Sequence, residues 1–85
     1  MTKRDKLLKK IRQHPKNVSF EELRTLLEAF GFELQRTRGS HHSFVRKSGG
    51  RKRLLAVPYA HPLKAVYVRM ALALIDEILA EEEGL

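Results

Sequence analysis

Two turn signals divide the middle of the chain into three short strand-like segments. Gly39-Ser40 separates residues 32–38 from residues 41–47, and the segment KSGGRK then supplies a second turn before residues 53–58. A two-residue connection that contains glycine is typical of a tight antiparallel hairpin. Two successive hairpins predict a three-stranded antiparallel sheet, which ends at a proline because proline has no backbone N–H for a central strand.

Helical periodicity flanks these strands on both sides. In TKRDKLLKKIRQ the apolar residues fall on one side of a short helix, at about 3–14, that ends near a His-Pro pair. In VSFEELRTLLEAFG, Ser19 and Glu22 match a capping box, and Gly31 can close the helix in the left-handed conformation. A long amphipathic helix is predicted in HPLKAVYVRMALALIDEILAEEE, with core positions at Leu63, Val66, Met70, Ala73, Leu74 and Ile78.

The predicted order of elements is therefore α-α-β-β-β-α. It indicates an α+β fold in which the helices pack on one face of a three-stranded antiparallel sheet. A chain of 85 residues is expected to form one domain, 1–85, with no room for a second catalytic domain. Alternation along the second strand places His42 and Phe44 on one face and His41 on the other, and we expect Phe44 to face the helices.

The formal net charge of +7 is unevenly distributed along the chain. No Asp or Glu occurs from Leu34 to Ile75, and acidic residues gather in the flanks, above all from Asp76 to Glu83. The middle of the chain is a candidate surface for a polyanion, although a run of cations is equally typical of a solvated face. Its cationic residues are Arg36, Arg38, Arg46, Lys47, Arg51, Lys52, Arg53, Lys64 and Arg69.

The composition argues against several classes of protein. The chain has no cysteine, which excludes disulfide bonds and thiolate zinc sites and favours the reducing cytoplasm. The opening MTKRDKLLKKIRQ lacks the continuous apolar stretch of a signal peptide, and no apolar run approaches the length that spans a bilayer. We therefore expect a soluble cytoplasmic protein that does not act at a membrane, and the sequence gives no indication of its oligomeric state.

The segment RTRGSHHSFVRK places two adjacent histidines directly after the first turn. Histidine titrates near neutral pH and suits proton transfer, while neighbouring Arg and Lys can stabilise charge on a reacting phosphate. RNA supplies its own nucleophile, the 2′-hydroxyl, so such a site needs no metal. A metal site formed by His41 and His42 is not expected, because adjacent strand residues point to opposite faces and no thiol or nearby carboxylate completes a coordination shell. The alternative is that both histidines are ordinary strand residues.

The stretch GFELQRTRGSHHSF, with a helix before it and a basic hairpin and VP and HP pairs after it, resembles the HicA toxin family of bacterial and archaeal toxin–antitoxin systems. The resemblance covers roughly residues 20–74. It implies a ribonuclease that cleaves mRNA, a fold similar to double-stranded-RNA-binding domains, and inhibition by a HicB antitoxin. It places the catalytic histidine at His41, with His42 as the alternate because some members carry one residue more before it. The first helix and the acidic end, 76–85, lie outside the usual family form.

These observations together predict a metal-independent endoribonuclease that uses no cofactor, acts on mRNA and binds a HicB-like antitoxin over the sheet near His41. The alternative is a non-catalytic RNA-binding module on the same basic sheet. Two further residues, Tyr59 and Tyr67, could stack on bases, although an aromatic residue beside an apolar stretch more often belongs to a core. The predicted RNA-binding residues are Gly39, which permits a tight turn, Ser40, which can donate a hydrogen bond, and Arg36, Arg38, Arg46, Lys47, Arg51, Lys52 and Arg53.

Overall fold

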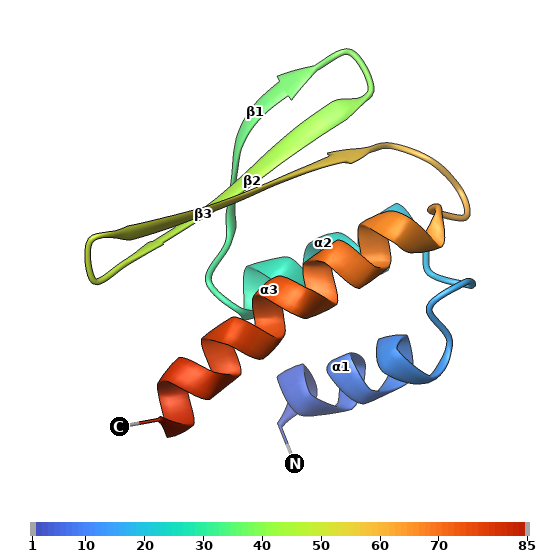
Figure 1. Cartoon of the computed structure of the whole chain (residues 1–85). Coiled ribbons are helices and arrows are strands. Elements are labelled where there is room, and N and C mark those ends of the chain that lie inside the picture. The colour runs from blue at the N-terminus through green and yellow to red at the C-terminus, as the bar shows by residue number, and fades with distance from the viewer. Residues whose placement is uncertain (1, 85) are drawn as a thin grey trace.

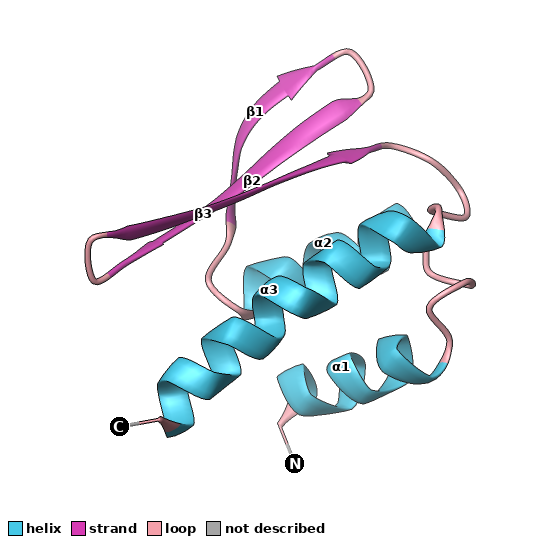
Figure 2. Ribbon diagram, in the orientation of Figure 1, coloured by secondary structure: helices cyan, strands magenta, loops and turns pink. Residues whose placement is uncertain are grey.

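A three-stranded sheet lies on one side of the molecule, and three helices lie on the other (Figure 1). The computed structural model describes residues 2–84. The α+β order predicted from the sequence is confirmed, as the colouring by secondary structure shows (Figure 2). The elements are α1 (Lys3–Gln13), α2 (Phe20–Ala29), β1 (Glu33–Arg38), β2 (His41–Ser48), β3 (Arg51–Pro58) and α3 (Ala65–Glu83).

Both predicted turns form, and they fix the register of the sheet in the order β1-β2-β3. Arg38 pairs with His41 across the first turn, where Gly39 has a φ of +59°. Ser48 pairs with Arg51 across the second, whose two glycines also have positive φ. Since this second turn occupies only two residues, β3 begins two residues before the predicted start at Arg53.

The helix α2 begins and ends as its sequence predicts. The Ser19 hydroxyl accepts a hydrogen bond from the Glu22 backbone N–H, and the Glu22 carboxylate accepts one from the Ser19 N–H, both at 3.1 Å. An ion pair with Lys10 at 2.8 Å and these hydrogen bonds hold the pKa of Glu22 below its ordinary value. Gly31 follows the helix with a φ of +87°, which only glycine adopts readily. This capping fixes the point at which the chain turns from α2 into β1.

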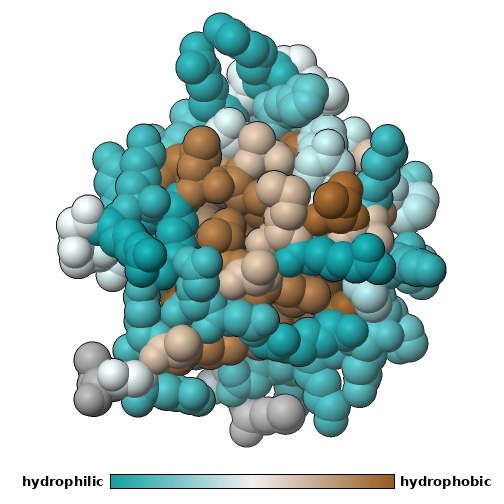
Figure 3. All heavy atoms as spheres, in the orientation of Figure 1, coloured by the Kyte–Doolittle hydropathy of each residue, from teal (hydrophilic) through white to brown (hydrophobic). Residues whose placement is uncertain are grey.

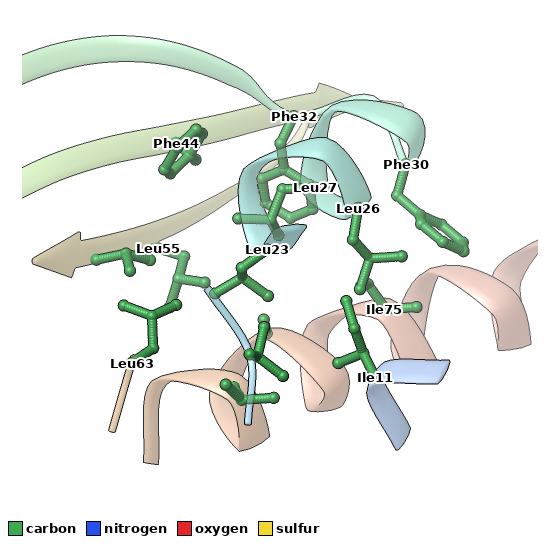
Figure 4. Packing of buried hydrophobic residues seen from close by; sticks show 14 of the residues in the cluster. Ile11, Leu23, Leu26, Leu27, Phe30, Phe32, Phe44, Leu55, Leu63 and Ile75 are labelled. Carbon is green, nitrogen blue, oxygen red and sulfur yellow. The ribbon is translucent and has the colours of Figure 1, made fainter. Parts of the chain in front are cut away.

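The core lies between the inner face of the sheet and the helices (Figure 4). Phe44 of β2 is fully buried and faces the helices, as predicted. Ile11 of α1 lies beside Ile75 of α3, so α1 packs on the helical layer (Figure 4). Among the largest fully buried side chains are Phe32, Phe44, Ile11, Leu23, Leu26, Leu27, Leu63, Ile75 and Ile78.

The buried face of α3 differs from the one predicted. Val66 and Met70 are 51% and 48% exposed, and Ala73 is also exposed, so three of the six predicted core positions are wrong. The helix instead buries Val68, Ala71 and Ile75, while Leu63 and Ile78 are buried as predicted and Leu74 is half-buried. The first half of α3 is apolar almost all round, so its periodicity alone does not select one face. Hydrophobic side chains accordingly gather on the molecular face shown in Figure 3.

Ion pairs hold α1 against the acidic end of α3. Arg4 contacts Glu82 at 3.0 Å, and Arg12 contacts Asp76 at 2.6 Å. The Arg4 guanidinium also lies 4.2 Å from the centre of the Phe30 ring, a cation–π contact with the residue that ends α2. The hydrogen bond from Arg4 holds the pKa of Glu82 below its ordinary value. The two segments predicted to lie outside the usual family form thus contact each other.

Candidate nucleic-acid interface

The two adjacent histidines of β2 lie on opposite faces of the sheet, as strand alternation predicts. His41 is exposed on the outer face, which no helix covers (Figure 1). His42 is half-buried on the inner face, where its ring lies 4.7 Å from the ring of Phe20 at the start of α2. The histidines therefore belong to two different environments, one solvated and one bounded by aromatic side chains.

The imidazole of His42 is held in one orientation by the turn before it. Its Nδ1 lies 3.0 Å from the backbone carbonyl oxygen of Ser40. A carbonyl oxygen only accepts hydrogen bonds, so Nδ1 carries the proton and, in the neutral ring, Nε2 keeps a free lone pair. The contact with Phe20 restricts the ring further. The surroundings of His42 thus fix the direction in which Nε2 points.

Tyr59 completes this inner-face cluster from the end of β3. Its backbone N–H donates to the same Ser40 carbonyl at 2.6 Å, which joins the β1–β2 turn to the segment after β3. Its ring lies 5.1 Å from Phe20 and 6.4 Å from His42. The phenolic O–H donates to the Glu21 carboxylate at 3.2 Å, and this hydrogen bond raises the pKa of Tyr59.

The outer face of the sheet is cationic around a small apolar centre. Arg36 and Arg38 pair with Ser43 and His41, and Lys47 of β2 lies directly opposite Lys52 of β3. Like charges directly opposite each other in a sheet repel, so these lysines favour an anionic partner. None of these four cations forms an ion pair with a carboxylate in the part of the chain that the structure describes. A shallow hollow on this face is lined by Gln35, Arg36, Ser43, Val45, Lys47, Lys52 and Leu54.

Arg53, one of the predicted RNA-binding residues, does not lie on this outer face. It points to the helices and is only 5% exposed. Its guanidinium contacts Glu81 at 2.6 Å and Glu77 at 3.1 Å. These contacts raise the pKa of Arg53, while the hydrogen bond from Arg53 lowers that of Glu81. Its neighbour Arg51 is exposed but also pairs with Glu81, at 3.1 Å.

Arg46 also lies apart from the other predicted RNA-binding arginines. It falls on the inner face with His42 and Phe44, is half-buried, and its Nε lies near Gly31. One of its terminal nitrogens is buried without a hydrogen-bond partner among the described residues. Arg46 therefore does not join Arg36 and Arg38 around His41, because strand alternation directs it to the other face.

The sequence missed part of the environment of His42. No sequence pattern relates His42 to Phe20, Glu21 or Tyr59. These residues come from segments far apart in the chain, so no local spacing relates them. The one usable signal was strand alternation, which places His42 on the same face as Phe44 and so directs it toward the helices. Ser40 contributes to this cluster through its backbone carbonyl.

Two features are absent from residues 2–84. No group of three or more His, Cys, Asp or Glu side chains in this range is placed to hold a metal ion. None of the helices in the same range combines the length and the apolar character needed to cross a membrane.

Comparison with known proteins gives one match. The sequence model of the family described as "HicA toxin of bacterial toxin-antitoxin" matches residues 20–75, well over half of the chain. The matched range runs from the start of α2 into α3 and contains the whole sheet, with α1 and the acidic end of α3 outside it. The comparisons with curated proteins and with solved structures found no match.

Proposed function

The chain belongs to the HicA toxin family, and from this premise and the setting of His42 we propose that it is a metal-independent endoribonuclease that cleaves mRNA in the cytoplasm. As a HicA toxin it is the toxin of a toxin–antitoxin pair. The observation that carries the proposed chemistry is the hydrogen bond from His42 Nδ1 to the Ser40 carbonyl. It fixes the direction of Nε2 on the inner face, next to the turn that carries His41 on the outer, cationic face.

The proposed reaction uses the nucleophile that RNA itself carries. Nε2 of neutral His42 takes the proton of a 2′-hydroxyl, and the 2′-oxygen at the same time forms a bond to the adjacent phosphorus. The bond from phosphorus to the 5′-oxygen of the next nucleotide breaks, and that oxygen takes up a proton from water. The products are one RNA end with a 2′,3′-cyclic phosphate and one with a 5′-hydroxyl. Positioned proton transfer of this kind is worth about 10²–10⁴ in rate.

His41 has a different role in this proposal, although the family resemblance placed it first and His42 second. It lies on the outer face opposite Arg38, next to the turn that orients His42. There it adds to the cationic surface that attracts phosphates, and no contact fixes its ring comparably within the described residues. His42 is the better candidate for the base because a base must be held toward the proton it removes.

Cleavage should persist in EDTA and weaken steeply with added salt. The proposed reaction uses no metal, while Arg and Lys bind phosphates in competition with salt cations. Purified protein is mixed with an end-labelled RNA in EDTA, and the new ends are mapped for a cyclic phosphate. A loss of cleavage in EDTA that returns with a divalent ion would contradict the mechanism. So would a product that carries a 5′-phosphate, because it requires water rather than the 2′-hydroxyl as the nucleophile.

A HicB-like antitoxin inhibits the enzyme, in this proposal, by covering the outer face of the sheet near His41. That face presents Arg36, Lys47 and Lys52 around Leu54, which is 58% exposed. An apolar centre ringed by cations fits a partner with an acidic rim and an apolar contact of its own. Coverage of the same face excludes the phosphates of RNA, so one surface serves both partners.

Charge reversal at Arg36 and Arg38 should weaken the binding of both RNA and antitoxin, by roughly tenfold or more at low ionic strength and by less at high salt. Titration of each partner against Arg36→Glu and Arg38→Glu measures this effect. The matched control is Arg24→Glu, on the exposed surface of α2, where the wild-type arginine pairs with Glu28. Antitoxin that still binds both variants with wild-type affinity would place its interface elsewhere.

A further inference from the structure

Tyr59 is an exposed aromatic residue that the proposed reaction does not use. Its side chain is 54% exposed, whereas the other tyrosine, Tyr67, packs partly buried against the core. Its ring lies 6.4 Å from the ring of His42 at the end of the basic sheet, and exposed aromatic rings of RNA-binding proteins stack on unpaired bases. We infer that Tyr59 is the stacking site for an unpaired nucleobase of the RNA, an inference that rests on the proposed ribonuclease function.

Three contacts fix the ring of Tyr59 before any ligand arrives. Its backbone N–H donates to the Ser40 carbonyl, its hydroxyl donates to the Glu21 carboxylate, and its ring rests on Phe20. A ring that is already fixed loses little conformational entropy when a base stacks on it. The stacking site is therefore already formed in the free protein.

The position of the ring connects base binding to the chemistry. The centres of the Tyr59 and His42 rings are 6.4 Å apart, so a nucleotide whose base stacks on Tyr59 has its ribose and phosphate close to His42. Both residues also share the Ser40 carbonyl as their hydrogen-bond acceptor. A shift of the β1–β2 turn would thus move the rings of Tyr59 and His42 together.

Glu21 determines the side from which the RNA backbone approaches. Its carboxylate lies against the Tyr59 hydroxyl and repels phosphates from the α2 side of the ring. The phosphates then run toward His41 and Arg38 at the turn, while the base covers Tyr59. This arrangement requires a base that is free of its neighbours, because in a duplex the faces of the bases are already stacked on one another. The ligand is therefore a single-stranded segment of RNA.

The test measures binding without cleavage. The probe is a fluorescent single-stranded RNA whose 2′-hydroxyls are methylated, which removes the nucleophile and keeps the bases. Tyr59→Ala should raise the Kd by roughly 5- to 150-fold, the range expected for loss of one base–aromatic stack. Tyr59→Phe should stay close to the wild type. The matched control is Val66→Ala, which removes an apolar side chain of similar exposure, 51%, from α3, away from the sheet.

A methylated duplex RNA gives the second arm of the test, and its Kd should be the same for wild type and Tyr59→Ala. Glu21→Gln keeps an acceptor for the tyrosine hydroxyl and should tighten binding of the single strand. An unchanged Kd in Tyr59→Ala would overturn the stacking site, as would an equal loss for single strand and duplex. Loss of antitoxin binding alone would make Tyr59 a protein contact and would equally overturn it. Failure of the proposed catalysis is seen separately, as the absence of cleavage of unmethylated RNA.

Discussion

Replacement of His42 by alanine should lower the rate of RNA cleavage by about 10²–10⁴-fold, the usual worth of a positioned acid–base group. His41→Ala should keep the wild-type rate at saturating RNA, because His41 contributes to attraction and not to proton transfer. Single-turnover cleavage by the purified variants measures both effects. Growth arrest on overexpression should disappear in His42→Ala and persist in His41→Ala.

Two controls make the His42 experiment decisive. Circular dichroism should show a folded His42→Ala protein, since the ring is only half-buried, and most RNA affinity should remain because the free cations lie on the other face. A loss of cleavage in His41→Ala alone would mean that His41 is the catalytic residue, as the family resemblance implies. RNA binding without cleavage in the wild type would instead favour the non-catalytic RNA-binding module.

Ile75→Ala should lower the free energy of unfolding by about 2–5 kcal/mol, because it removes a fully buried side chain between α3 and α1 and leaves a cavity. Met70→Ala, five residues earlier on the exposed side of α3, should stay within about 0.5 kcal/mol of the wild type. Urea denaturation followed by circular dichroism gives both values. Should Ile75→Ala fail to fold, Ile75→Val should still cost about 0.5–1.5 kcal/mol.

This pair of substitutions also tests which face of α3 is buried. The face predicted from the sequence contains Met70 and leaves Ile75 outside it. A larger loss in Met70→Ala than in Ile75→Ala would therefore mean that α3 packs in the predicted orientation. Equal and small losses would mean that α3 contributes little to the core.

The parts of the fold that the sequence predicts well are those decided by local chemistry. Gly39 and the Gly-Gly pair need positive φ, and the Ser19–Glu22 capping box satisfies backbone groups within one turn. Each of these signals acts over a few residues, so it can be read before the tertiary structure is known. The face of α3 is decided instead by its neighbours, because an almost uniformly apolar segment has several equivalent faces.

In the candidate site, too, the sequence predicts what local chemistry decides and misses what tertiary packing decides. Adjacent strand residues point to opposite faces, so the sequence predicts that His41 and His42 separate, and they do. Which histidine acquires an orienting partner depends on Ser40, Phe20 and Tyr59, which meet only after the sheet packs on α2. The charge pattern predicts a cationic middle but not that the acidic end of α3 lies against part of it. The charge pattern therefore groups Arg53 with the cations of the outer face, whereas the structure places it against the helices.

The pairing of Arg4, Arg12, Arg51 and Arg53 with the acidic end of α3 shapes the electric field of the whole protein. These contacts neutralise four arginines, whereas Arg36, Arg38, Lys47 and Lys52 keep their positive charge, unopposed among the described residues, on the outer face of the sheet. A polyanion that approaches by diffusion is attracted to this face before contact. The carboxylates from Asp76 to Glu82 therefore reduce the competition of the four paired arginines for the incoming strand.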